Sequence, residues 1–254
     1  MPRYGQSQMS FWPPFTGMVR SIILVTSAVF LVTYLPVQLM PSAFGFRGVP
    51  LGTEYFGLIP VEVTHHLLVW QLATYLFLHG GWSHIIFNCL ALWMFGYELE
   101  RVWGSRRFLF YFFLTGVGAG LFNVLLDPSG GIPVIGNSGA VYGILLAYGV
   151  LFPDRPIFLY FVIPVKAKWF VLIMGLVEFW MSLTQPGSGV AHIAHLGGML
   201  FGYLYLRRVR GTRGGGSGFD LRGQYEEWRR ARLRRKFEVY MQKRDHKDPD
   251  HWVN

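Results

Sequence analysis

Six apolar segments fill most of the chain, and they constrain its fold more than any other feature. A helix needs about 20 apolar residues to cross a bilayer core of about 30 Å. The segments lie at residues 18–40, 84–99, 108–126, 138–152, 169–183 and 190–206. Several are short or contain polar side chains, which is typical of helices surrounded by other helices. The sequence therefore predicts an all-α membrane protein, with a six-transmembrane-helix bundle over residues 18–206 and a short fourth helix.

Charged residues are scarce and unevenly placed. They make up 15% of the chain, whereas typical soluble domains contain roughly 25%. Residues 207–254 contain 14 of the 23 Lys and Arg residues and seven of the 14 acidic residues, so this tail carries +7 of the net charge of +9. We expect a glycine-rich spacer over 211–218, then a basic helix over 225–243. Such a tail favours anionic lipid headgroups as its partner, and we do not expect it to bind nucleic acid.

The connections between the segments alternate in basic content. Lys and Arg accumulate in the cytoplasmic loops of membrane proteins. Loops 41–83, 127–137 and 184–189 contain only Arg47, whereas the second and fourth connections contain Arg101, Arg106, Arg107, Arg155, Lys166 and Lys168. We therefore expect a multi-pass protein of the bacterial cytoplasmic membrane with both termini, including segment 1–17, in the cytoplasm. The long, aromatic-rich loop 41–83 is expected to lie in the membrane interface.

Polar side chains inside the apolar segments are candidate functional residues, because they are costly in lipid and usually face the bundle interior. His84 and Asn88 are four residues apart, so a helix places them on one face. Ser138 begins the fourth segment. The other candidates are Glu178 in the fifth segment, and His192 and His195 in the sixth.

The fourth segment is too short to cross the membrane, because 15 residues make only about 22 Å of helix. Ser138 should then lie below the outer surface, with residues 127–137 entering the protein as irregular backbone that lines a polar cavity. The first turn of a helix has free N–H groups and a positive end, both of which favour a developing anion.

Two glycine pairs predict which side chain meets Ser138. Gly139 and Gly143 follow the serine, and Gly198 and Gly202 follow His195. Such pairs allow two membrane helices to approach closely, so the fourth and sixth helices should bring hydroxyl and imidazole together. His192 is the competing candidate for the base. Taken alone, Ser138 could also be a helix N-cap.

Three motifs resemble those of the rhomboid intramembrane serine proteases. The G-x-S-G motif occurs as Gly136-Asn137-Ser138-Gly139 and the H-x-x-x-N motif as residues 84–88. The A-H-x-x-G-x-x-x-G motif occurs as residues 194–202. Each motif lies at the expected end of the second, fourth or sixth segment, and the resemblance covers about residues 19–206.

The resemblance implies a Ser138–His195 dyad that cleaves transmembrane or juxtamembrane segments of other membrane proteins, without a metal or another cofactor. His84, Asn88 and a backbone N–H would stabilise the oxyanion, and Tyr142 would stack on the catalytic imidazole. Glu100 corresponds to a structural acid of the family. Gln71 follows Trp70 where many members have arginine, which puts that arginine's contacts in the first loop in doubt.

The same resemblance predicts that Glu178 is not a third catalytic member, because the family's dyad works without an acid and its fifth helix is a mobile gate. We expect this carboxyl to be protonated or hydrogen-bonded within the bundle. Two other classes of function compete with a protease: a rhomboid-like binder of transmembrane clients that does not cut them, and a small transporter. The intact Ser138, His195, His84 and Asn88 argue against a pure binder. No inverted repeat supports a transporter.

Overall fold

The computed structural model describes residues 13–40, 49–159, 162–185 and 191–211, and in the tail residues 230, 233–234 and 237–241. The chain divides into two compact units, Met1–Leu206 and Arg207–Asn254. The described tail residues beyond 211 are helical. The glycine-rich spacer predicted over 211–218, most of the helix predicted over 225–243 and most of segment 1–17 lie outside the described residues.

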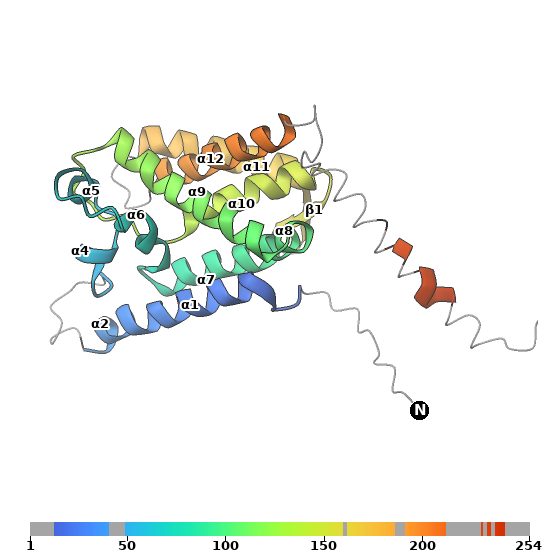
Figure 1. The fold of residues 1–254 in the computed structure, drawn as a ribbon, viewed down its shortest axis with the longest axis horizontal. Helices are drawn as coiled ribbons and strands as arrows, with labels where there is room; N and C mark the ends of the chain where they lie inside the picture. The colour runs from blue at the N-terminus through green and yellow to red at the C-terminus, as the bar shows by residue number, and fades with distance from the viewer. Residues whose placement is uncertain are drawn as a thin grey trace, which may run out of the picture. The chain divides into compact units, whose positions relative to one another are not determined.

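The first unit is mostly helical, as the sequence predicts (Figure 1). Its long helical segments are α1 (Gly17–Thr33) with α2 (Leu35–Leu39), α7 (Trp82–Ala91), η2 (Leu92–Gly96) and α8 (Tyr97–Trp103), α9 (Ser105–Leu126), α10 (Ser138–Leu151), α11 (Ala167–Thr184) and α12 (His192–Gly211). The first loop contains α4 (Thr53–Phe56), α5 (Pro60–His65), α6 (Gln71–Thr74) and η1 (Tyr75–Phe77). Every predicted apolar segment therefore overlaps a helix.

Three of these helices are long and apolar enough to cross a membrane, by length and composition: Gly17–Leu39, Ser105–Leu126 and Ala167–Thr184. The α10 helix is apolar but has only 14 residues. The second predicted segment, 84–99, is part of a longer run of helical residues from α7 to α8, with a π-helical turn at η2.

The mostly helical unit also contains one short hairpin that the sequence analysis does not predict. The fourth connection contains strand β1 (Pro156–Leu159), which pairs antiparallel with β2 (Ile163–Lys166). Both strands are rich in β-branched and aromatic residues, which suit a half-exposed pleated surface. Hydrophobicity alone does not reveal so short a hairpin, because its residues resemble those of the neighbouring helices.

The α10 helix lies at the centre of the bundle. It contacts α9, α11, α8 and η2, and most of its residues are buried. Its glycines permit this packing: a Cβ atom at Gly143 would lie 2.6 Å from the Cβ atom of Thr115 on α9. By contrast, α1 and α11 expose many large apolar side chains, including Val32 and Trp180. This arrangement suits a central helix shielded by outer helices that face lipid.

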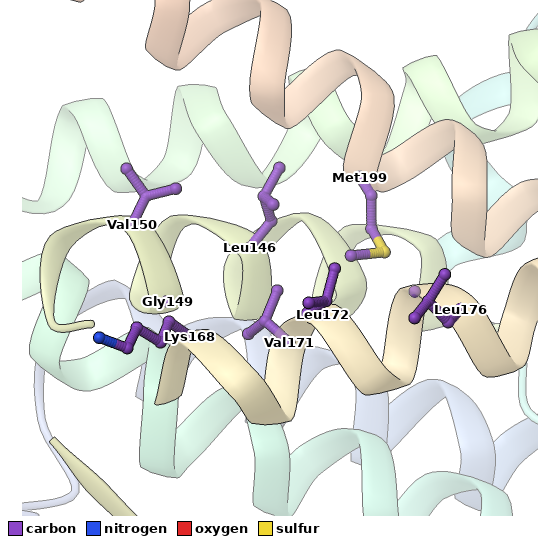
Figure 2. A pocket seen from close by; sticks show the side chains of 9 residues that line it. Leu146, Gly149, Val150, Lys168, Val171, Leu172, Leu176 and Met199 are labelled. Carbon is purple, nitrogen blue, oxygen red and sulfur yellow. The ribbon is translucent and has the colours of Figure 1, made fainter. Parts of the chain in front are cut away.

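A cavity of about 340 Å³ lies between α10, α11 and α12, and Figure 2 shows the side chains that line it. Its lining is almost entirely apolar, with Leu146, Leu172 and Met199 among the residues and Lys168 at one end. Ser138 is not part of this lining. Ser138 lies instead at the N-terminal end of α10.

Candidate active site

The chain reaches Ser138 through the irregular segment 127–137. Leu58 of the first loop forms a β-bridge with Val134, and the N–H of Gly136 donates to the carbonyl of Tyr75 at 2.9 Å. Gly136 has φ 105°, a conformation that favours glycine. Ser138 is then the first residue of α10 and is half-buried. The predicted position of the serine on the first helical turn is therefore confirmed.

A close approach of backbones joins α10 to α12. A Cβ atom at Gly198 would lie 1.9 Å from the carbonyl oxygen of Gly139, so no other residue fits there without displacement. The predicted contact between the two helices is confirmed at this pair. The second member of each glycine pair packs elsewhere: Gly143 lies against Thr115, and Gly202 against the Tyr111 hydroxyl, both on α9.

This packing brings Ser138 and His195 together. The serine Oγ lies 2.7 Å from Nε2 of His195, within hydrogen-bonding distance. The ring of Tyr142, one turn further along α10, stacks on the imidazole with centroids 4.4 Å apart and an interplanar angle of 13°. The imidazole is buried. A hydroxyl and an imidazole in this geometry can act as a nucleophile and its base.

Glu178 contacts this pair, which the depth argument from the sequence left open. Its Oε2 atom lies 2.9 Å from Nδ1 of His195, the ring nitrogen that faces away from the serine. The same oxygen lies 2.7 Å from Nδ1 of His192, and the Tyr142 hydroxyl donates to Oε1. The carboxyl is thus hydrogen-bonded within the bundle, as expected. One of its partners is His195, the proposed base, for which the dyad hypothesis requires no acid.

The competing base, His192, contacts the carboxylate. No described contact places its ring on Ser138, and its centroid lies 6.2 Å from that of His195. The local sequence explains the difference: three positions along a helix turn a side chain by about 300°. The two imidazoles of α12 therefore approach Glu178 from different directions, and the geometry assigns the serine contact to His195.

The opposite side of Ser138 is formed by α7 and the loops. A Cβ atom at Gly136 would lie 2.5 Å from Nε2 of His84, so this ring lies directly against the segment before the serine. Asn88, on the same helix face, is buried and donates through Nδ2 to the carbonyl of His84 at 3.0 Å. The structure therefore brings His84 to the site, whereas the amide of Asn88 is bonded to its own helix.

Further polar atoms lie on this side. His79, in the loop before α7, is fully buried, with its ring centroid 4.8 Å from that of His84. Burial lowers the pKa of His79 to about 3, so this imidazole is neutral at pH 7. The side chain of Asn137 faces His79, but among the described residues neither its amide nor Nε2 of His79 makes a well-aligned hydrogen bond. Such atoms usually bind water.

Within the part of the chain that the structure describes, one group of residues could hold a metal ion by composition: Glu178, His192 and His195, all buried. Ligand atoms around a tetrahedral zinc ion are about 3.3 Å apart, given bonds of about 2.0–2.1 Å. The two nitrogen–oxygen distances here, 2.7 and 2.9 Å, are those of direct hydrogen bonds. The present geometry therefore favours proton-mediated contacts within this cluster.

Gln71 stands where many family members have an arginine, and its side chain makes hydrogen bonds to the first loop. Its side chain is fully buried beneath the first loop. Oε1 accepts the N–H of Ile59 at 2.9 Å, and Nε2 donates to the carbonyl of Glu54 at 3.1 Å. The side chain thus ties together the loop backbone that packs against segment 127–137.

Glu100 is a second buried carboxylate, and its partners lie at the starts of α1 and α9. Its oxygens accept the N–H groups of Met18 at 2.6 Å and Val19 at 2.9 Å, and also the hydroxyl of Ser105. A carboxylate at a helix N-terminus satisfies free N–H groups and favours the positive helix end. This geometry is that of a structural acid, far in sequence from the serine.

Comparison with known proteins identifies a matching family and several relatives. The Rhomboid domain matches residues 66–211. The chain is 32% identical to the Bacillus subtilis rhomboid protease GluP over 137 residues, which cover 53% of this chain and 25% of GluP. It is 31% identical to the chloroplastic rhomboid-like protein 11 of Arabidopsis thaliana over 184 residues, which cover 63% of this chain and 60% of that protein.

A third relative is the putative rhomboid protease YdcA of Bacillus subtilis. It is 29% identical over 137 residues, which cover 53% of this chain and 64% of YdcA. The chain therefore spans a quarter of the length of GluP and somewhat less than two thirds of the other two relatives.

Proposed function

Because this chain belongs to the rhomboid family, we propose that it is an intramembrane serine protease that hydrolyses peptide bonds in transmembrane or juxtamembrane segments of other membrane proteins. The observation that carries the proposal is the 2.7 Å contact between Ser138 Oγ and His195 Nε2 at the first residue of a central helix. A binding protein has no need of a hydroxyl and an imidazole held in this way.

In the proposed reaction, Ser138 Oγ attacks the scissile carbonyl while Nε2 of His195 takes the hydroxyl proton. The resulting oxyanion accepts hydrogen bonds from the backbone N–H at the start of α10 and from His84 and Asn88. Collapse of this intermediate breaks the C–N bond, and the imidazolium gives its proton to the leaving amine. Water then attacks the acyl-enzyme, with His195 again acting as the base, and releases the acid and the free serine.

The proposed oxyanion role requires one change from the present geometry. The Asn88 amide donates to the His84 carbonyl, so it must turn toward Ser138 when substrate binds. Catalytic hydrogen bonds often align only in the substrate complex. His84 needs less movement, because its ring already lies against Gly136.

The contacts at the two ends of the bundle support a six-span topology with cytoplasmic termini. Glu100 at the end of α8 binds the start of α1, and Arg155 of the fourth connection pairs with Glu98 at 3.1 Å. The basic connections therefore share one end with the start of α1. The loops on the other side also meet, at the Leu58–Val134 bridge. By the positive-inside rule, the basic end faces the cytoplasm.

We propose the bacterial cytoplasmic membrane as the location, with the basic tail on anionic headgroups. The relatives include a chloroplast protein, so members of the family occur in more than one kind of membrane. The substrate must be a segment that can unwind, because a carbonyl bonded within its own helix cannot reach Ser138. No metal or nucleotide cofactor is part of the proposed reaction.

The test is labelling and cleavage with the full-length protein in proteoliposomes. A serine-directed fluorophosphonate should label wild type but not Ser138→Ala. The same preparation should cleave a model transmembrane substrate at one site, identified by mass spectrometry. Labelling without cleavage of a panel of substrates with unstable helices would favour the binder of transmembrane clients. Absence of both labelling and cleavage in folded protein would refute the proposal.

A further inference from the structure

The feature that goes beyond a Ser–His pair is the carboxylate behind it. Glu178 lies on α11, whereas Ser138 and Tyr142 lie on α10 and both histidines on α12. Only 5% of its surface is exposed, although α11 as a whole exposes most of its apolar side chains. A carboxylate on an otherwise lipid-facing helix is costly unless it is fully hydrogen-bonded.

The hydrogen-bond partners of this carboxylate fix the state of both imidazoles. Oε1 accepts from the Tyr142 hydroxyl, and Oε2 lies within hydrogen-bonding distance of Nδ1 of His192 and of His195. An ionised carboxylate only accepts hydrogen bonds, so if Glu178 is ionised both Nδ1 atoms carry protons. Neutral His195 protonated on Nδ1 has a free lone pair on Nε2, which is the atom that faces Ser138. This is the tautomer that a general base needs.

We propose that Glu178 is a positioning residue for His195. This inference rests on the proposed protease function. The carboxylate holds the imidazole in the required tautomer and orientation and stabilises the imidazolium that forms when Ser138 loses its proton.

The alternative assignment of this cluster is a metal site built from the same three side chains. The two assignments differ in what lies between the nitrogen and oxygen atoms, a proton or an ion. If the cluster is held by hydrogen bonds, chelators do not change the turnover of the enzyme. A metal-dependent one loses activity with EDTA and regains it with zinc.

The experiment compares Glu178→Gln and Glu178→Ala with wild type in proteoliposomes. The matched control is Glu100→Gln, the same substitution at a buried carboxylate whose partners are Met18, Val19 and Ser105. Competent sites are counted by end-point fluorophosphonate labelling, and kcat is expressed per labelled site. Thermal unfolding of each variant reports the folded fraction.

We expect Glu178→Gln to lower kcat per labelled site by about 10- to 100-fold, because a charge-assisted hydrogen bond to the imidazolium becomes a neutral one. KM should change by less than about twofold, since the carboxylate does not touch substrate. Glu178→Ala, if it folds, should lose at least as much, because it also removes the acceptor for Nδ1. The control should keep kcat per labelled site, even if fewer sites are competent.

Three results would overturn the proposal. The first is a kcat per labelled site within about twofold of wild type in Glu178→Gln. The second is a fall in the number of labelled sites alone, which indicates a purely structural role. The third is loss of wild-type activity with EDTA and recovery with zinc, which assigns the cluster to a metal. Failure of wild type itself to label or cleave would instead refute the proposed function, so the two failures are distinguishable.

Discussion

On the α12 side of Ser138, both ring nitrogens of His195, both oxygens of Glu178 and the Tyr142 hydroxyl have protein partners. On the α7 side, Nε2 of His79 and the amide of Asn137 lack well-aligned partners among the described residues, and the Asn88 amide is bonded to its own helix. The first side is thus preorganised, whereas the second keeps polar groups available for water or substrate. A base needs one fixed tautomer, while an oxyanion site must accept an oxygen atom that arrives with the substrate.

The largest expected effect comes from removing either side chain of the Ser138–His195 contact. Ser138→Ala and His195→Ala should each lower turnover by at least about 10⁴-fold, because removal of either partner eliminates the nucleophile or its base. The measurement is cleavage of a transmembrane substrate in proteoliposomes, with thermal unfolding as the control for folding. If His195→Ala cleaved normally and His192→Ala did not, the serine contact seen here would not be the catalytic one.

The second expected effect addresses the α7 side. Asn88→Ala should lower kcat by about 10²–10³-fold, or about 2.7–4 kcal/mol, if its amide turns to the oxyanion as proposed. His84→Ala should lower kcat less if the backbone N–H compensates. The measurement is kcat per labelled site for both variants and for the double variant. Wild-type turnover in the double variant would exclude any oxyanion role for this helix face.

The sequence predicts the contact between Ser138 and His195 because the position of a serine on a short helix and a glycine pair are both local patterns. The contact of Glu178 is harder to predict. Its depth along α11 overlaps that of His195, but depth does not say which face of α11 turns inward. That rotation depends on the packing of α11 against α10, where a Cβ atom at Gly149 would lie 2.9 Å from a side-chain carbon of Val171.

The other differences between expectation and structure also concern contacts that depend on three-dimensional packing and not on a local sequence pattern. Gln71 could be identified as a departure from the family's arginine, but its hydrogen bonds depend on the path of the first loop backbone, which has no periodicity to predict it. The β1–β2 hairpin and the π-helical turn at Leu92–Gly96 add little to the hydropathy pattern. Glu178 and His192 lie outside the three motifs, but both are ionisable residues within apolar segments. That shared property is the signal from which their contact could have been predicted.

A smaller effect sharpens the comparison within the preorganised side. His192→Leu removes one of the three donors to Glu178 but leaves Tyr142 and His195 in place. We expect kcat per labelled site to fall by less than about tenfold, because this hydrogen bond reaches the serine only through the carboxylate and the second imidazole. Both variants are measured in the same assay. If His192→Leu lowers kcat per labelled site more than Glu178→Gln does, the positioning role belongs to His192 and not to the carboxylate.

The smallest expected effect concerns the tail, which contributes none of the residues placed at the site. Every residue placed at the site precedes Arg207, where the second compact unit begins, and α12 ends at Gly211. Truncation after Gly211 therefore keeps the whole of α12, and kcat per labelled site in detergent should stay within about twofold of wild type. Residues 212–254, which this truncation removes, contain 11 Lys and Arg and seven acidic residues, a net charge of +4. The isolated peptide should therefore bind anionic vesicles and lose that binding as salt increases. If the truncated protein folds and labels normally but no longer cleaves in detergent, the tail contributes to the reaction itself. Binding that persists at high salt would instead point to apolar insertion of the tail into the vesicle.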